Sequence, residues 1–306
     1  MTDAVGDATP ARASFGARLA EAMRRRSPLC VGIDPHPSIL EAWGLRADRD
    51  GLEAFGRLLV DAAAGRAAVV KPQVAFFERA GAAGFEALAR IIDHAHASGL
   101  LVIADAKRGD IGTTAAAYAD AWLNPAGAFH ADAVTLSPYL GFGSLAGSID
   151  AAREWGSGVF VLAATSNPEG RPVQTAIAAT SEVPGRTVAA GIVAQVAAAN
   201  TIELDSGADA ATGQPGASAL GSIGLVLGAT LALDEYGLDL DTLGPTPVLA
   251  PGFGAQGARI EALRLRFGGA AGRVLVSESR GITDAGPSSL GAAVQDRVER
   301  IAAALG

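Results

Sequence analysis

Short apolar runs recur along the chain and alternate with segments in which apolar residues follow helical spacing. Runs of this length that are apolar throughout are typical of strands buried on both faces. We expect strands at 29–34, 68–72, 100–103, 133–136, 159–164, 223–227, 247–250 and 273–276, and a last helix near 288–305. Eight strands that alternate with helices and end in polar or Gly/Pro-rich residues predict a single-domain (β/α)₈ TIM barrel. An open doubly wound sheet is the alternative fold.

Two segments do not fit the repeat. Residues 1–12 carry little apolar patterning, and we expect a flexible N-terminal tail there, followed by the barrel domain at 13–306. The segment at about 201–218 is rich in Gly, Ala, Asp and Ser. We interpret it as a surface insertion before the sixth strand.

The third strand leads into the most charged strand end of the chain, LLVIADAKRGDIGTT at 100–114. Because side chains alternate across a strand, Asp105 and Lys107 share one face. Gly109 can let the chain turn and bring Asp110 back to the same small volume. A salt-bridged strand end is the simpler interpretation of one Asp-x-Lys pair. Three charges beside so apolar a strand favour a functional site.

In a barrel, residues that follow the strands meet at one rim, where barrel enzymes keep their active sites. The residues expected around this cavity are Asp34, Lys71, Asp105, Lys107, Asp110, Ser166, Gln256 and Arg280. The glycine-rich segment at 251–257 exposes backbone N–H groups, and Arg280 follows the next strand. Barrels commonly bind phosphate at this position, so we expect a phosphate site there.

Composition narrows the function further. Hydrophobic residues make up 49% of the chain and the net charge is -8, which argues against broad nucleic-acid binding. No apolar run reaches the length of a membrane span, and the N-terminus lacks a hydrophobic signal core, so we expect a cytoplasmic protein with no membrane contact. The single cysteine, Cys30, lies in an apolar run and is interpreted as a small buried side chain.

The histidines do not suggest a metal site. His94 and His96 are two residues apart on an expected helix and point in different directions, while His36 and His130 stand alone. No nucleophile elbow, Cys/His pair or dinucleotide fingerprint is present. We therefore expect no metal and no organic cofactor, and a chemistry of electrostatics and proton transfer by lysine.

The segment DAKRGDIG at 105–112 closely resembles the signature of the orotidine 5′-phosphate decarboxylase family. Other segments of that family follow in the same order: LCVGIDPHP, VVKPQVAFFE, ATSNPEG, PGFGAQG and the segment around Arg280. The chain is similar to the longer bacterial enzymes in which TSNPEG follows the fifth strand. The resemblance covers about residues 29–282, with gaps in the insertion.

The resemblance implies a cofactor-free enzyme of de novo pyrimidine synthesis, which converts orotidine 5′-monophosphate to UMP and CO₂ as a homodimer with shared active sites. It assigns the catalytic charged network to Lys71, Asp105, Lys107 and Asp110, with Asp110 reaching into the neighbouring subunit. It also implies that Asp34 holds ribose hydroxyls, Ser166 the pyrimidine edge, Gln256 and Arg280 the 5′-phosphate, and that Thr114 crosses the dimer interface.

Two other functions fit parts of the pattern. A sugar-phosphate decarboxylase or isomerase on the same barrel also uses an Asp-x-Lys pair, but normally recruits Mg²⁺ through additional acids. A non-catalytic sensor of a phosphate ligand would keep the barrel, but binding alone does not need a buried network of lysines and aspartates. The electrostatic chemistry favours the decarboxylase, because Lys107 can stabilise a carbanion and then protonate it.

Overall fold

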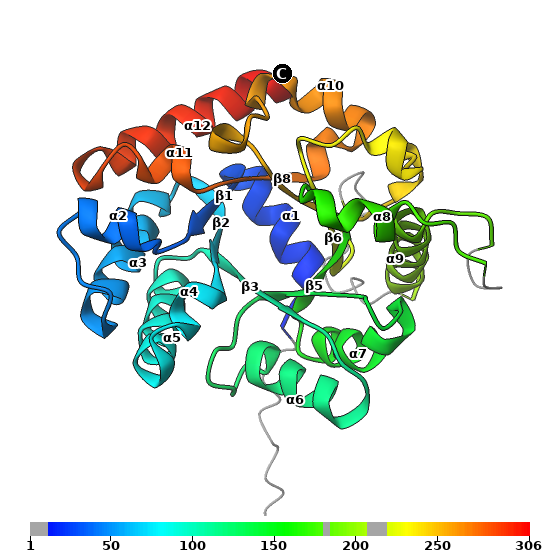
Figure 1. Ribbon diagram of the computed structural model, residues 1–306, viewed down its shortest axis with the longest axis horizontal. Coiled ribbons are helices and arrows are strands. Elements are labelled where there is room, and N and C mark those ends of the chain that lie inside the picture. Colours follow the sequence, from blue (N-terminus) through cyan, green and yellow to red (C-terminus); the bar gives the residue numbers. More distant parts are fainter. Residues whose placement is uncertain (1–11, 180–183, 207–218) are drawn as a thin grey trace, which may run out of the picture.

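The computed structural model describes residues 12–179, 184–206 and 219–306. Eight parallel strands close into a barrel in chain order, with helices around the outside (Figure 1). The strands are β1 (Ser27–Ile33), β2 (Ala67–Pro72), β3 (Leu101–Arg108), β4 (Ala133–Leu136), β5 (Gly158–Ala164), β6 (Ile223–Leu227), β7 (Val248–Pro251) and β8 (Val274–Glu278). The closure of β1 against β8 confirms the predicted TIM barrel and excludes the open doubly wound sheet.

Helices lie between the strands, as the alternating pattern predicts, and the last helix lies within the predicted range 288–305. They are α1 (Phe15–Arg25), α2 (Pro37–Ala42), α3 (Arg49–Ala63), α4 (Val74–Glu78), α5 (Gly81–Ala97), α6 (Gly112–Leu123), α7 (Ala146–Glu154), α8 (Arg171–Gln174), α9 (Val188–Asp205), α10 (Leu263–Phe267), α11 (Arg280–Thr283) and α12 (Leu290–Leu305). Among the described residues, no helix combines the length and the apolar character needed to cross a membrane.

Alternation along the strands builds two cores. On β1, Leu29 and Val31 pack in the large core between the barrel and the surrounding helices. Cys30, between them, points into the barrel and packs in a smaller inner core. As expected, Cys30 is a fully buried side chain, and its burial raises the pKa of the thiol to about 12. Apolar side chains therefore fill the interior below the site.

Helix α1 closes the N-terminal end of the barrel. Ser14 caps the helix by accepting a hydrogen bond from the N–H of Ala17 at 3.2 Å. Phe15 is fully buried in the inner core, and its ring meets Phe160 edge-on at 5.9 Å. Gly158 makes room for it, because a Cβ there would lie 2.2 Å from Phe15 Cδ1. The cavity that a ligand can enter lies at the other end, at the carboxyl ends of the strands.

The ends of two expected segments differ from the sequence prediction. Helix α9 continues through Thr201 to Asp205, which we assigned to the insertion, because Glu203 is buried there and binds the N–H of Ser222 through Oε1 at 3.1 Å. The rest of the expected insertion, residues 207–218, lies outside the described residues. So do residues 1–11 of the expected tail, whereas Arg12 is held 2.5 Å from Asp132.

Candidate active site

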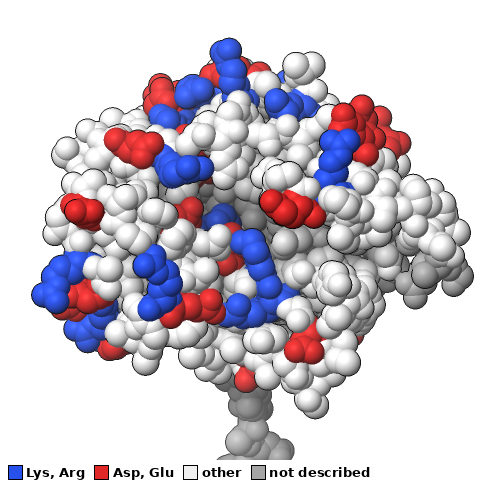
Figure 2. Space-filling view, viewed as in Figure 1, with Lys and Arg blue, Asp and Glu red and all other residues white. Residues whose placement is uncertain are grey.

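A cavity of about 240 Å³ lies at the carboxyl ends of the barrel strands. The space-filling view down the barrel shows the hollow, with acidic and basic side chains at its edge (Figure 2). Seven of the residues predicted from the sequence line this cavity: Asp34, Lys71, Asp105, Lys107, Ser166, Gln256 and Arg280. The position of these residues just after, or at the end of, their strands brings them together.

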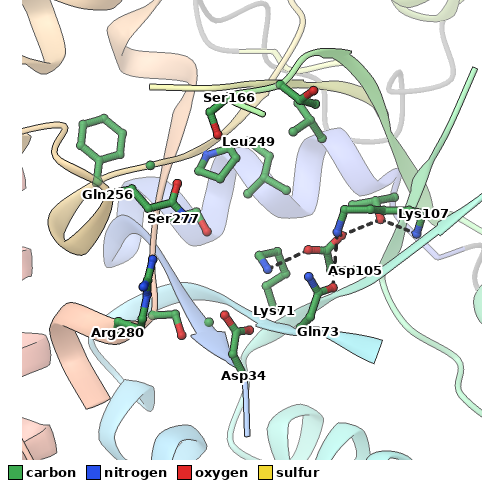
Figure 3. Close-up of a pocket in the computed structure, with 18 of the residues that line it drawn as sticks. Asp34, Lys71, Gln73, Asp105, Lys107, Ser166, Leu249, Gln256, Ser277 and Arg280 are labelled. Carbon is green, nitrogen blue, oxygen red and sulfur yellow. Dashed lines mark hydrogen bonds and ion pairs between the residues drawn. The ribbon is translucent and has the colours of Figure 1, made fainter. Parts of the chain in front are cut away.

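Asp105 is the centre of a charged network between two lysines. Its Oδ2 lies 3.0 Å from Lys71 Nζ, and its Oδ1 lies 2.6 Å from Lys107 Nζ (Figure 3). Lys71 comes from β2, whereas Asp105 and Lys107 occupy alternate positions on β3. Lys71 is buried, whereas the Lys107 side chain is 46% exposed and faces the cavity. Both lysines line the cavity, but Lys107 is the more accessible cation of the network.

Contacts within the network shift the pKa values of Asp105 and Lys71 so that both groups stay charged. Burial alone would raise the pKa of the Asp105 carboxyl, but the charge of Lys71, followed by that of Lys107, holds the pKa well below its usual range. Burial alone would likewise lower the pKa of Lys71, but the negative charges of Asp105 and Asp34 raise it above its ordinary value. Near neutral pH the Asp105 carboxylate and the Lys71 ammonium therefore both stay charged.

Gln73 also belongs to the network, although it was not among the site residues predicted from the sequence. With the amide oriented to satisfy both of its ends, its nitrogen donates to the backbone O of Asp105 at 2.7 Å and to Oδ2 at 3.1 Å. Its oxygen then accepts from Lys107 Nζ at 3.3 Å. The signal was available, since residues two apart share a strand face and Gln73 follows Lys71 at that spacing. Gln73 was not predicted because an uncharged side chain at a strand end does not by itself indicate a site.

Lys107 has an unusual backbone. Its φ is 48°, in the left-handed region that side chains other than glycine rarely adopt. We expected Gly109 to provide the turn, but Gly109 is instead required for close packing, because a Cβ there would lie 2.4 Å from the O of Ser137. Strained backbone of this kind clusters at functional sites.

Asp110 and Thr114 are the two predicted site residues that do not line the cavity. The expectation that Asp110 folds back beside Asp105 within one chain is wrong. Its Oδ1 accepts a hydrogen bond from the N–H of Ile111 at 2.8 Å, which holds it at the start of α6. Thr114 is exposed on that helix. Both residues lie where a second chain could meet them.

The cavity wall at Asp34 has unsatisfied acceptors and donors. Within the described part of the chain, Asp34 Oδ1 and Ser279 Oγ are buried and have no hydrogen-bond partner. Buried polar atoms are normally paired, so two such atoms in one cavity wall indicate a place for ligand hydroxyl groups. Asp34 follows β1 and Ser279 follows β8, which are neighbours in the barrel.

Ser166 lies on a loop that a side-chain clamp holds. Gln174 of α8 accepts from the N–H of Thr165 at 3.0 Å and donates to Thr165 Oγ1 at 2.7 Å. Thr165 Oγ1 in turn donates to Asn167 Oδ1 at 2.7 Å. These bonds fix the loop after β5 and leave Ser166 on the cavity wall, where a polar ligand edge could bind it.

The cavity wall on the side away from Lys107 is suited to an anion. Gly252, Gly254 and Gly257 have φ values of 119°, 69° and 102°, so the loop after β7 takes a path that other residues resist. Gln256 of this loop and Arg280 at the start of α11 border the cavity. Among the described residues, none forms an ion pair with Arg280, so its guanidinium is free for an anionic ligand.

An ion pair between the buried Glu278 and the partly buried Arg297 supports this wall from behind. Glu278 Oε1 accepts from Arg297 Nε and Nη2, each at 3.2 Å, and Arg297 Nη2 also donates to the O of Gly281 at 2.8 Å. A Cβ at Gly254 or Gly281 would lie 2.4 Å or 1.9 Å from the same Oε1. The glycine loop and the start of α11 therefore pack directly on Glu278.

Across the described ranges, no group of three or more His, Cys, Asp or Glu residues has the placement of a metal site.

Comparison with known proteins places this cavity in a family. The family model for "Orotidine 5'-phosphate decarboxylase / HUMPS family" matches residues 27–293. The chain is 50% identical over 290 residues to an orotidine 5′-phosphate decarboxylase of Salinispora arenicola, covering 95% of this chain and 96% of the relative. It is 49% identical over 274 residues to the enzyme of Streptomyces coelicolor, covering 89% and 91%.

A solved structure agrees with these relatives. The crystal structure of a Streptomyces avermitilis protein described as the same decarboxylase superposes with a TM-score of 0.86 at 46% identity, covering 99% of both chains. The charged network and the cavity wall that includes Gln256 and Arg280 lie within the matched residues. The chain therefore belongs to the orotidine 5′-phosphate decarboxylase / HUMPS family.

Proposed function

We propose that this chain decarboxylates orotidine 5′-monophosphate to UMP and CO₂, a step of de novo pyrimidine synthesis, and that Lys107 carries the chemistry. The enzyme activity is that of relatives that match it over nearly their whole length. The observation that carries the assignment to this cavity is the contact of Asp105 with both Lys71 and Lys107 at the strand ends.

The decarboxylation requires stabilisation of the negative charge that develops at C6. Breaking the bond between C6 and the carboxylate releases CO₂ and leaves the electron pair on C6, in the plane of the ring, where the π system cannot delocalise it. The Lys107 ammonium can attract this charge as it forms and then donate a proton to C6, which yields UMP. The Lys107 side chain does not need to reorganise for this step, because Asp105 and Gln73 already hold its ammonium group in place.

Asp105 contributes through repulsion as well as positioning. A substrate carboxylate placed against it at about 4 Å would be repelled by about 4 kcal/mol at an effective dielectric constant of about 20. The repulsion ends when CO₂ leaves. We give the preorganised Lys107 the larger part, because such charges stabilise the transition state directly.

The remaining cavity walls match the rest of the nucleotide. We assign the ribose hydroxyls to Asp34, whose buried Oδ1 has no partner among the described residues. We assign the pyrimidine edge to Ser166 and the 5′-phosphate to Gln256 and Arg280, which border the cavity from the other wall. The phosphate is far from the reacting carbon, so its binding energy can be used to close the loop after β7 over the ring.

We further propose a homodimer in which Asp110 and Thr114 enter the partner's site. The exposed apolar residues Ile111, Tyr139 and Leu140 surround this part of the surface, with exposures of 61%, 83% and 54%. They come from the loops after β3 and β4, which touch where the N–H of Ser137 donates to the O of Arg108 at 2.8 Å. Exposed apolar groups gathered in this way favour a protein interface.

A purified sample tests the function through the loss of the ultraviolet absorbance of orotidine 5′-monophosphate and the appearance of UMP. We expect this turnover to be unaffected by EDTA, because the proposed mechanism uses lysine and no metal, and we expect the enzyme in the cytoplasm on cell fractionation. Activity that EDTA abolishes and Mg²⁺ restores, with a sugar phosphate as the better substrate, would support the sugar-phosphate enzyme. Binding of UMP without any turnover of orotidine 5′-monophosphate would support the sensor.

A further inference from the structure

The backbone of β3 bulges where it carries Asp105 and Lys107. Ala104 pairs with Val134 of β4, and the next pair joins Arg108 to Leu136. Asp105, Ala106 and Lys107 therefore lie opposite a single β4 residue, Thr135. A bulge re-aims side chains, which explains how Lys107 turns towards the cavity with a φ of 48°.

Thr135 fills the gap that this bulge leaves in the strand ladder. Its Oγ1 accepts the hydrogen bond of the Lys107 N–H at 2.9 Å. The same Oγ1 donates its proton to Asp105 Oδ1 at 2.9 Å. One hydroxyl thus binds the backbone of the reactive lysine and the carboxylate between the two lysines. Thr135 is 1% exposed and lines the cavity wall, so water cannot easily take its place.

We propose that Thr135 is a positioning residue of the decarboxylation, an inference that rests on the function proposed above. Its hydroxyl holds the strained Lys107 backbone and sets the Asp105 carboxylate 2.6 Å from the Lys107 ammonium. It does not touch the reacting carbon, and it acts through the placement of Lys107. Small displacements of such groups are costly, because catalysis depends on the geometry of the charge that meets the transition state.

Three substitutions at this position separate the hydroxyl from the volume of the side chain. Thr135→Val keeps the shape and removes both hydrogen bonds, and Thr135→Ala removes them with less volume. Thr135→Ser retains the hydroxyl. The matched control is Thr246→Val. Thr246 is also fully buried and accepts a hydrogen bond from Asn200 Nδ2 at 3.0 Å, but it precedes β7 at the opposite end of the barrel.

The measurements are kcat and KM for orotidine 5′-monophosphate, the Kd of UMP, and the melting temperature of each variant. We expect Thr135→Val and Thr135→Ala to lower kcat by roughly 10- to 100-fold. The Kd of UMP should stay within about threefold of wild type, because the groups assigned to ribose and phosphate are untouched. Thr135→Ser should recover kcat to within about threefold, and Thr246→Val should lower the melting temperature without changing kcat.

Several results would overturn the positioning role. One is a folded Thr135→Val enzyme with wild-type kcat, and another is a Thr135→Ser enzyme as impaired as Thr135→Val, which would assign the effect to packing. Failure of both Thr135→Val and Thr135→Ala to fold, when Thr246→Val folds, would make the hydroxyl a requirement of folding and would also reject the proposal. If wild type and Thr246→Val do not turn over orotidine 5′-monophosphate, the proposed function itself is wrong.

Discussion

Arg280 separates the grip on phosphate from the chemistry at C6. No described residue pairs with its guanidinium, which borders the cavity on the wall away from Lys107. We expect Arg280→Ala to lower kcat/KM for orotidine 5′-monophosphate by at least about 100-fold, since the charged contact that we assign to the 5′-phosphate is lost. Orotidine, which lacks the phosphate, should be turned over about equally by both enzymes.

The control for this substitution is Arg25→Ala, an exposed arginine at the end of α1 on the closed end of the barrel. It removes the same charge without touching the cavity, and steady-state kinetics should match wild type. Equal losses on orotidine and its phosphate for Arg280→Ala would show that Arg280 supports the fold of α11 and does not bind phosphate.

At the scale of single residues, the charged members of the site could be predicted from the sequence. Lys71, Asp105 and Lys107 were expected in one cavity because each follows an apolar run, and the structure brings them there. Gln73 and Thr135 were missed because amides and hydroxyls occur at the ends of many strands without a task. The bulge that gives Lys107 its positive φ was also missed, because it depends on the pairing of β3 with β4 and not on β3 alone.

Helix α1 is held in place by a buried carboxylate. Asp132, 1% exposed, accepts hydrogen bonds from Arg12 at 2.5 Å, from His96 Nε2 at 2.9 Å, from the N–H of Val102 at 2.8 Å, and from Arg18. Burial alone would raise its pKa, but the hydrogen bond from His96 and the charge of Arg18 lower the pKa to about 2. The carboxylate ties α1 to the amino-terminal ends of β3 and β4.

This depressed pKa predicts a loss of stability in acid. The folded protein holds the proton of Asp132 less tightly than the unfolded chain, whose pKa is near 3.8. The stabilisation is therefore complete above about pH 4 and is lost as the pH falls towards about 2. We expect Asp132→Asn to lower the free energy of unfolding at pH 7, and this deficit to shrink as the pH falls below about 4, measured by urea denaturation. A deficit that stays constant down to the lowest pH at which both proteins fold would contradict the linkage.

Strands were predicted to within a residue or two at most ends, because apolar runs bounded by Gly, Pro or charge mark them directly. The exception is β3, which continues through Asp105 and Lys107 to Arg108 because these polar side chains face the cavity and bind each other. The role of α1 could not be predicted. Its apolar face, with Phe15 and Leu19, shows that it packs on something, but not that it closes the barrel floor.

For the whole chain, the eightfold repeat was sufficient to predict a closed barrel. The oligomeric state could not be predicted from the hydrophobic pattern. An apolar residue or a carboxylate in a loop gives the same sequence signal whether the loop faces solvent or a second chain. The placement of Asp110 outside its own cavity makes the shared site testable.

Mixed dimers test whether Asp110 serves the partner's site. We expect Lys107→Ala and Asp110→Ala to be nearly inactive alone. After dissociation and mixing, half of the dimers contain one chain of each kind, and in these one site has both intact groups. About a quarter of wild-type activity should then return, if the assembly is a closed two-fold dimer.

The control is a mixture of Lys107→Ala with the double variant, which can restore no site and should stay inactive. Mixed dimers can be counted with a tag on one chain. If they form and the activity is only the sum of the separate mutants, Asp110 does not complete a neighbouring site.

The role of Lys107 is tested most directly by following the ultraviolet absorbance of orotidine 5′-monophosphate with wild type and with Lys107→Ala under the same conditions. The substitution removes the cation that meets the carbanion and the proton donor together. We expect wild type to convert the substrate to UMP, and kcat of the variant to be lower by at least about 10⁴-fold. The variant should still bind UMP and keep the melting temperature of a folded barrel. A folded Lys107→Ala enzyme whose kcat lies within tenfold of wild type would contradict the proposed mechanism.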